Sequence, residues 1–219
     1  MDMQLDNRRA LITGSTSGIG YAIARALAAE GARVTLTGRT QARVDDALAR
    51  LKQTLPRAQA DGVAADCGSA EGARQVFERV PEVDILVNNL GVYNRKPFGE
   101  LTDEDWQRMF EINVMSGVRF TRFYAPKMAK RGWGRVVFVS SESGLNIPPD
   151  MIHYGMTKSA QLSISRGLAV AYAGTGVTVN TLLPGPTRTE TSQQQRAQRA
   201  QAAGVTVAQI EADFFVTHR

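Results

Sequence analysis

The chain has 219 residues, of which 43% are hydrophobic and 21% are charged, and these values are typical of one folded globular domain rather than a disordered chain. No stretch approaches the roughly 20 continuous apolar residues that a membrane span needs, and the formal net charge of +5 is spread along the chain instead of forming the basic face of a nucleic-acid-binding protein. A single cysteine, Cys67, and an amino-terminal segment without an apolar leader predict a cytoplasmic protein.

Short β-branched runs alternate with helical patterns from the start of the chain. In the first half, the periodicity predicts strands over 10–13, 33–37, 62–65 and 83–87, and helices over 18–30, 41–55 and 70–80. In the second half, it predicts a long helix from Thr102 towards Arg131, a strand over 134–139, a helix over 153–173 and a strand over 177–183. Pro126 is expected to kink or divide the long helix.

Beyond Thr187 the sequence becomes polar and predicts a helix rich in Gln, Arg and Ala, followed by an amphipathic piece over 207–215. The regular alternation of strand and helix before that point is typical of a parallel sheet with helices on both faces. We therefore predict a doubly wound parallel α/β sheet in three layers, formed by a single domain over 1–219.

The first strand ends in the run TGSTSGIG, from Thr13 to Gly20, which passes directly into a helix. Side chains at Gly14 and Gly18 would obstruct the close approach of a pyrophosphate to the backbone, and Gly20 allows the helix to lie close to the sheet. Free peptide N–H groups and the positive end of the helix then attract the anion. An ordinary Gly/Ser loop is the alternative, but the strand before the run and the helix after it favour a dinucleotide site.

The residue that reads the adenosine ribose is expected at the end of the second strand, where an acid would accept a hydrogen bond from a free 2′-hydroxyl. The strand ends instead in Thr37-Gly38-Arg39-Thr40, without an acid. An arginine attracts a 2′-phosphate that a carboxylate would repel. Arg39 therefore favours NADP(H) over NAD(H), although NAD(H) stays an alternative if Arg39 is only a solvated residue at a helix start.

A second informative run, Ser140-Ser141-Glu142-Ser143-Gly144, ends the fifth strand, and Tyr154 and Lys158 follow it. Tyr154 and Lys158 are four residues apart, so they lie on the same helix face. A nearby ammonium is expected to lower the pKa of the phenol, which would let Tyr154 exchange a proton with a carbonyl oxygen. A Tyr-x-x-x-Lys pair alone is common on helix surfaces, but its combination with a serine at a strand end and the glycine run predicts hydride-transfer chemistry.

These motifs together resemble the short-chain dehydrogenase/reductase family in its compact single-domain branch, whose fold is of the Rossmann type. The resemblance extends from Leu11 to about Thr189. It includes the family's Asn-Asn-Ala-Gly motif, present here as Asn88-Asn89-Leu90-Gly91, its catalytic Asn at Asn113, its Pro-Gly motif at Pro184-Gly185, and its adenine-side Asp at Asp66. Family members usually continue with another helix and an edge strand, so we expect either that the sequence is a truncation or that this sheet lacks both elements.

The resemblance implies a role for each matched residue. Tyr154 would be the general acid/base, Lys158 would lower its pKa and bind the nicotinamide ribose, Ser141 would orient the carbonyl and Asn113 would hold a water in the proton relay. The implied cofactor-binding residues are Gly14, Ser15, Ser17, Gly18, Ile19, Gly20, Arg39, Asp66, Cys67, Asn89, Gly91, Tyr154, Lys158, Pro184, Gly185, Thr187 and Thr189. The segment 187–219 would form a substrate lid, a homo-oligomer (dimer or tetramer) is implied, and no metal site is expected.

The sequence therefore predicts an NADP(H)-dependent oxidoreductase that interconverts a carbonyl compound and an alcohol, with no nucleic-acid or membrane partner. The substrate would be a small-molecule carbonyl compound or alcohol of medium size, and an acidic group on it would lie near Arg95 or Arg188. Two alternatives stay open: an NAD-preferring dehydrogenase, and a non-catalytic nucleotide-sensing or scaffold protein on the same fold.

Overall fold

The computed structural model describes residues 3–217 of the chain. The chain divides into two compact units, Met1–Gly185 and Pro186–Arg219. The first unit holds the whole sheet, and the second holds two helices, α7 (Glu190–Ala203) and α8 (Val207–Thr217). The division falls next to residue 187, where the predicted lid begins, and the role of that segment as a lid stays a prediction.

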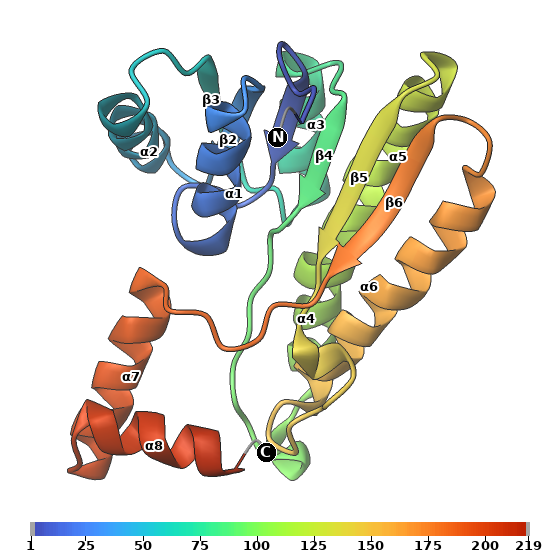
Figure 1. Cartoon of the computed structure of the whole chain (residues 1–219). Helices are drawn as coiled ribbons and strands as arrows, with labels where there is room; N and C mark the ends of the chain where they lie inside the picture. Colours follow the sequence, from blue (N-terminus) through green and yellow to red (C-terminus); the bar gives the residue numbers. More distant parts are fainter. Residues whose placement is uncertain (1–2, 218–219) are drawn as a thin grey trace. The chain divides into compact units, whose positions relative to one another are not determined.

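Six strands of the first unit form one parallel sheet in the order β3-β2-β1-β4-β5-β6. The strands are β1 (Arg9–Ile12), β2 (Arg33–Gly38), β3 (Ala60–Ala64), β4 (Ile85–Asn88), β5 (Gly134–Val139) and β6 (Val177–Leu182). The chain winds outwards from β1 in one direction through β2 and β3, and then in the other through β4, β5 and β6 (Figure 1). The reversal places the carboxyl ends of β1 and β4 side by side, which is where ligands bind in such sheets.

Helices cover both faces of this sheet, which confirms the predicted fold class. The principal helices are α1 (Gly18–Ala29), α2 (Gln41–Thr54), α3 (Ala70–Arg79), α4 (Asp103–Phe110), α5 (Ser116–Lys130) and α6 (Ile152–Ala171). Alternate residues of β1 divide between two apolar cores: Ala10 and Ile12 pack with α1 and α2, whereas Leu11 packs with α3 and α5. This two-sided burial explains why the central strands β1, β4 and β5 carry nearly continuous apolar runs.

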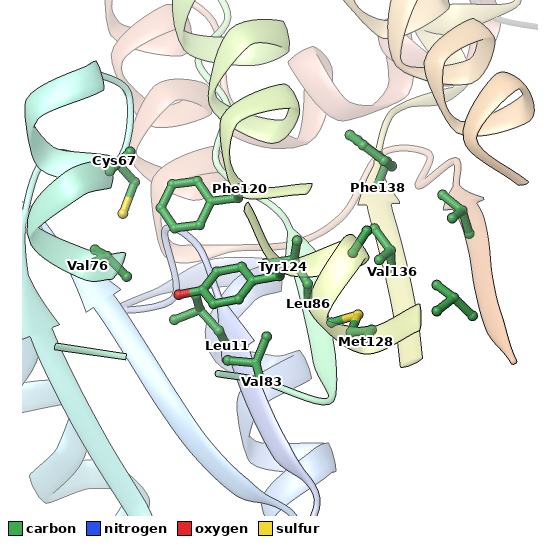
Figure 2. Close-up of a cluster of buried hydrophobic side chains, with 14 of the residues drawn as sticks. Leu11, Cys67, Val76, Val83, Leu86, Phe120, Tyr124, Met128, Val136 and Phe138 are labelled. Atoms are coloured by element: carbon green, nitrogen blue, oxygen red, sulfur yellow. The ribbon is translucent and has the colours of Figure 1, made fainter. Parts of the chain in front are cut away.

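The core on the Leu11 face is dominated by aromatic side chains of α5. Phe120 and Tyr124 are fully buried, and Figure 2 shows them beside Leu11, Leu86 and Val76. The Tyr124 hydroxyl donates to the carbonyl oxygen of Val80 at 2.6 Å, so the polar end of this ring is satisfied inside the core. Burial raises the pKa of Tyr124 far above its ordinary value.

The long helix predicted from Thr102 is divided, but Pro126 is not the cause. α5 continues through Pro126 as one helix, and the interruption is a π-helical turn, Glu111–Met115, between α4 and α5. Proline removes one backbone N–H from the hydrogen-bond ladder of a helix, and α5 stays one helix from Ser116 to Lys130 in spite of that loss. Thr102 begins α4 with the expected capping arrangement, in which it exchanges hydrogen bonds with Asp105.

Within residues 3–217, β6 pairs with β5 alone and lies at the edge of the sheet. Val177 and Val179 of β6 face the core, whereas Thr178 and Asn180 are exposed and Leu182 is 50% exposed. One face of β6 is thus open to solvent at this edge of the described sheet.

Candidate active site

The glycine run forms a tight loop between β1 and α1. Gly14 and Gly18 adopt φ values of +63° and +58°, which side-chain-bearing residues rarely adopt. A Cβ on Gly20 would collide with the side-chain amide of Asn89 and lie 2.7 Å from the Gly14 carbonyl oxygen. The absence of a side chain at Gly20 therefore lets α1 lie close to the glycine loop and to Asn89, the residue after β4.

The first turn of α1 presents free backbone donors. Ser17 is the N-cap in extended geometry, and its side chain accepts no hydrogen bond from the turn. In the described part of the chain, the N–H groups of Gly18, Ile19 and Gly20 donate to no other group. Unpaired amides at a helix start, together with the helix dipole, form a site for an anion such as phosphate.

Thr13 and Asn89 join the ends of β1 and β4. The Thr13 hydroxyl accepts hydrogen bonds from the N–H groups of Asn89 and Leu90 at 3.0 and 3.1 Å. The Asn89 side-chain amide donates to the carbonyl oxygens of Thr13 and Gly14. Asn89 thus holds the glycine loop to the carboxyl end of β4.

Ser15 and Cys67, both in the predicted cofactor set, have side chains engaged in the interior of the protein. The Ser15 side chain is fully buried; its hydroxyl donates to the Ile12 carbonyl and accepts from the Thr37 N–H, so it joins β1 to β2. Cys67 belongs to the core beside Val76 and Phe120 (Figure 2), and burial raises the pKa of its thiol to about 11. Neither side chain faces the surface at the carboxyl edge of the sheet.

Arg39 and Asp66 lie at the carboxyl ends of β2 and β3, and both are exposed. Arg39 forms no ion pair or hydrogen bond with any other residue of the described chain, so its guanidinium is available to a ligand. Asp66 accepts a hydrogen bond from the Gly68 N–H at 3.1 Å, which shapes the turn leading into α3. The predicted purine-side residues thus share one edge of the sheet with the glycine loop.

Asn113 is fully buried in the π-helical turn, and its side chain is bound to the loop after β4. Its amide oxygen accepts from the Val92 N–H at 2.7 Å, and its amide nitrogen donates to the Val92 carbonyl at 2.9 Å. A Cβ on Gly91 would lie 3.5 Å from both Asn113 Oδ1 and Lys158 Nζ. Gly91 therefore passes close to both of these predicted catalytic residues.

Tyr154 and Ser141 are brought together by the ends of α6 and β5. The Ser141 hydroxyl lies within hydrogen-bonding reach of the Tyr154 phenol, and it also accepts from the Ser143 N–H at 3.1 Å. Tyr93, from the loop after β4, places its ring centroid 5.9 Å from that of Tyr154. The phenol is thus partly enclosed by three elements that are distant in sequence.

Burial raises the pKa of Tyr154 above its ordinary value, the hydrogen bond with Ser141 acts in the opposite direction, and the proximity of Tyr93 and Glu142 adds to the increase. The predicted lowering of this pKa by Lys158 is therefore wrong for this structure. The Lys158 ammonium lies 5.5 Å from the Tyr154 ring centroid, and its hydrogen bonds point elsewhere. Desolvation of the phenol is the largest influence on this pKa.

Lys158 is only 3% exposed. Its ammonium donates to the carbonyl oxygen of Val139 at 2.9 Å and to Gln161 Oε1 at 3.2 Å. Burial lowers the pKa of Lys158 to about 8. An ammonium has three donors, so these two bonds hold it in place and leave one donor for a ligand or for Tyr154.

The last predicted contacts lie on either side of the division between the two units. In the first unit, the Pro184 carbonyl accepts from the Glu142 N–H at 3.1 Å, which ties the Pro184-Gly185 turn to the segment after Ser141. In the second unit, Thr189 caps α7 by exchanging hydrogen bonds with Ser192, and Thr187 is exposed. Contacts of Thr187 and Thr189 with a cofactor stay predictions.

The two arginines expected to face an acidic substrate group are both paired with carboxylates. Arg95 donates to both oxygens of Asp150 at 2.8 and 2.7 Å. Arg188 lies 3.6 Å from Glu211. These ion pairs weaken the case for an acidic substrate, because each guanidinium is already partly neutralised.

Sequence reasoning missed Gln161 and the pairing of His153 with Asn94. Gln161 lies on the buried face of α6, which is unusually polar because it also carries His153, Thr157, Lys158 and Ser165. His153 Nε2 lies 2.7 Å from Asn94 Oδ1, and burial lowers the pKa of this histidine. The signal in the sequence was a polar stripe at helical spacing where an apolar one was expected.

The residues at this edge of the sheet fit a dinucleotide: two left-handed glycines, unpaired helix-start amides and an unpaired arginine. Across residues 3–217, no three His, Cys, Asp or Glu side chains gather as a metal site would require. No helix among the described residues is long and apolar enough to cross a membrane.

Comparisons with known proteins point to one family. A family model described as short chain dehydrogenase matches residues 8–200. The uncharacterized oxidoreductase YvaG of Bacillus subtilis (strain 168) is 44% identical over 219 residues, which cover 100% of this chain and 83% of that protein.

Two solved structures extend this likeness to the fold. The structure of L-sorbose reductase from Gluconobacter frateurii, complexed with NADPH and L-sorbose, matches with a TM-score of 0.88 and 32% identity, over 96% of this chain and 81% of that one. A 3-oxoacyl (acyl-carrier-protein) reductase from Agrobacterium tumefaciens C58 with NADP bound matches with a TM-score of 0.84 and 34% identity, over 90% of this chain and 77% of that one.

Proposed function

The chain belongs to the short-chain dehydrogenase/reductase family, and from that premise we propose that it is an NADP(H)-dependent oxidoreductase that interconverts a ketone or aldehyde with an alcohol. The observation that carries the proposal is the convergence of Ser141, Tyr154 and Lys158. The Ser141 hydroxyl is a hydrogen-bond partner of the Tyr154 phenol, and the Lys158 ammonium lies 5.5 Å from the centroid of the phenol ring. A carbonyl oxygen that gains negative charge needs both a proton donor and a positive field, and these residues supply them.

In the reducing direction, Tyr154 donates its phenol proton to the carbonyl oxygen while the C=O π bond breaks and a new C–H bond forms at the carbon. The reduced nicotinamide, when bound, supplies the hydride for that C–H bond. Ser141 donates a hydrogen bond to the same oxygen and orients it. The phenolate left on Tyr154 is stabilised by the Lys158 ammonium until a proton returns from solvent.

The pKa of Tyr154 above its ordinary value suits the reducing direction, because the phenol stays protonated at neutral pH and ready to donate. In the oxidising direction the same residue must first lose its proton, so we expect oxidation to be favoured by alkaline pH. Lys158 must be charged in both directions, and its lowered pKa of about 8 places its loss of charge within the range of an ordinary assay.

The cofactor would be held by the loop and by Arg39. The unpaired N–H groups of Gly18, Ile19 and Gly20 would bind the diphosphate, and the exposed Arg39 guanidinium would bind a 2′-phosphate. Asp66 and Asn89 would line the adenosine side, and Gly91 would allow a ribose to approach Lys158. The NADPH and NADP named for the two matching reductases support the same cofactor here.

The proposal is tested by turnover. Purified protein is mixed with NADPH or NADH and a panel of ketones, ketoses, β-ketoacyl thioesters and aldehydes. Oxidation of the cofactor is followed as the loss of the absorbance of the reduced nicotinamide. We expect carbonyl-dependent oxidation of NADPH for at least one compound. Tight NADPH binding without turnover of any compound would instead support the non-catalytic nucleotide-binding alternative.

A homo-oligomeric state stays a prediction from the family resemblance, and a cytoplasmic location stays a prediction from the single cysteine and the amino-terminal segment. Light scattering of the purified protein measures the first, since a dimer or tetramer has two or four times the mass of the 23.8 kDa chain.

A further inference from the structure

Gln161 links Lys158 and Asn113, two of the predicted catalytic residues, from inside the protein. Its Oε1 accepts from the Lys158 ammonium at 3.2 Å, and its Nε2 donates to the backbone carbonyl oxygen of Asn113 at 2.6 Å. The side chain is 1% exposed. Both functional atoms of the amide are therefore used, and each points at a different element.

We propose that Gln161 is a positioning residue for catalysis, which holds the Lys158 ammonium at a fixed distance from the π-helical turn and keeps it charged. The inference rests on the proposed function, because it assigns a role in the same proton transfer. Gln161 touches neither substrate nor the phenol, so it acts through Lys158.

The geometry leaves Lys158 few other supports. The ammonium is buried, and the described chain gives it two acceptors, the Val139 carbonyl of β5 and Gln161 Oε1. Removing water from an ammonium disfavours its charge, and each acceptor restores part of the lost stabilisation. Gln161 is the support that a substitution can remove, because Val139 contributes a backbone atom.

The second bond fixes the direction of the amide. Asn113 lies in a π-helical turn, where the wider hydrogen-bonding register re-aims backbone carbonyls. Because Nε2 donates to the Asn113 carbonyl, the amide oxygen faces the Lys158 ammonium. The reverse orientation would place the amide N–H donors against the ammonium, which would repel them. An amide does not titrate near neutral pH, so Gln161 holds the charge without exchanging a proton.

Two substitutions separate this role from simple packing. Gln161→Met keeps the volume and removes both hydrogen bonds, whereas Gln161→Glu keeps an acceptor on Lys158 and adds a negative charge. We expect Gln161→Met to lower kcat for reduction about tenfold with little change in the Kd for NADPH. In a plot of kcat against pH, the decline at alkaline pH (the alkaline limb) should move about one pH unit lower in this variant, because Lys158 loses its charge more easily. Gln161→Glu should move that limb higher.

The other titratable groups near this site are Tyr154 on α6, with Glu142 after β5 and Tyr93 after β4 facing its phenol. These groups are present in both variants, but the carboxylate added in Gln161→Glu would also raise the pKa of the Tyr154 phenol, so the alkaline limb is assigned by the titration of Lys158 itself. Ser165→Ala is the matched control, since Ser165 is buried one turn further along α6 and its loss should leave the pH profile unchanged. A lowered kcat in both variants with an unmoved alkaline limb would overturn the proposal and leave Gln161 a packing residue.

A measurement without substrate distinguishes failure of this inference from failure of the proposed function. The chain has five lysines, at positions 52, 96, 127, 130 and 158, so selective ¹³C labelling of lysine Cε gives a spectrum simple enough to assign. The Lys158 signal should titrate lower in Gln161→Met and higher in Gln161→Glu than in the unchanged protein. Opposite shifts without any carbonyl turnover would support the contact while contradicting the enzymatic role, and unchanged titration would reject the contact itself.

Discussion

The side-chain amide of Asn89, just after β4, donates to the carbonyl oxygens of both Thr13 and Gly14, at 2.9 and 3.0 Å. One amide nitrogen thus uses both of its protons to fix the entry of the glycine loop. The same nitrogen is the nearest atom with which a Cβ on Gly20 would collide, so the loop, the first turn of α1 and the end of β4 depend on one another.

Asn89→Asp tests this dependence with almost no change in volume. An ionised carboxylate cannot donate, and it faces two carbonyl oxygens that repel it. We expect the Kd for NADPH to rise at least about tenfold and the unfolding free energy to fall by about 1–3 kcal/mol. Isothermal titration and chemical denaturation measure the two effects. Asn180→Asp, on the exposed face of β6, is the control and should change neither.

Tyr154→Phe removes the proposed proton donor and keeps the ring. Carbonyl reduction should fall by at least about a hundredfold, the lower end of what a positioned acid contributes. The Kd for NADPH should change little, because the phenol is not among the groups that bind the diphosphate. Steady-state kinetics and fluorescence titration check the two parts. Residual activity within a few-fold of the unchanged protein would mean that another residue donates the proton.

Local signals made the fold largely predictable from the sequence. Most strands are short runs rich in apolar and β-branched residues, although β3 is a weak one, and α1 and α2 show 3.6-residue periodicity. The glycine run sits between a strand and a helix, where its φ values of +63° and +58° are needed. The predicted ends of β5 agree with the structure, and those of α1, α2 and α3 differ by one residue. These features depend on neighbours in sequence.

What the sequence left unpredicted depends on contacts between distant residues. Pairing of Arg95 with Asp150 joins residues 55 positions apart, and pairing of Gln161 with the Asn113 carbonyl joins residues 48 apart. The pKa of Tyr154 was predicted from its spacing to Lys158, but burial decides its direction, and burial is a property of the assembled fold. Ser15 belongs to the glycine run, yet the parallel pairing of β1 with β2 commits its hydroxyl to Thr37.

Arg39→Ala tests cofactor choice. Loss of a guanidinium that binds a 2′-phosphate should weaken NADPH binding about tenfold to a hundredfold and leave NADH binding unchanged. Arg57→Ala removes the same charge from the exposed turn after α2, at the opposite edge of the sheet, and should affect neither cofactor. Equal weakening of both cofactors would contradict the assignment of Arg39 to the 2′-phosphate, and tighter NADH than NADPH binding in the unchanged protein would favour the NAD-preferring alternative.

Tyr124→Phe tests the buried hydrogen bond in the core of α5. The substitution keeps the ring but leaves the Val80 carbonyl without its 2.6 Å donor. We expect a loss of about 1–2 kcal/mol in unfolding free energy, or about 2–8 °C in Tm for a chain of this size. Turnover per folded molecule should not change, since Tyr124 is remote from the proposed catalytic group. A stability equal to that of the unchanged protein would mean that the carbonyl finds another donor.

Asp84 gives the pH dependence of stability a defined sign. Burial of its carboxylate acts to raise the pKa, but hydrogen bonds from the Arg9 side chain and backbone, together with the charges of Arg9 and Arg131, outweigh it and lower the pKa below its ordinary value. An acid whose pKa is lowered by folding stabilises the protein above its unfolded pKa of about 3.9, and this stabilisation is lost as the pH falls through the folded value.

Asp84→Asn should therefore cost about 1–2 kcal/mol of unfolding free energy at pH 7, and the cost should shrink when unfolding is repeated near pH 3. Asp61→Asn, on the exposed side of β3, provides the baseline for losing a carboxylate without partners. A difference between Asp84→Asn and the unchanged protein that stays constant from pH 7 to pH 3 would show that the carboxylate stabilises the fold by its shape and not by its charge.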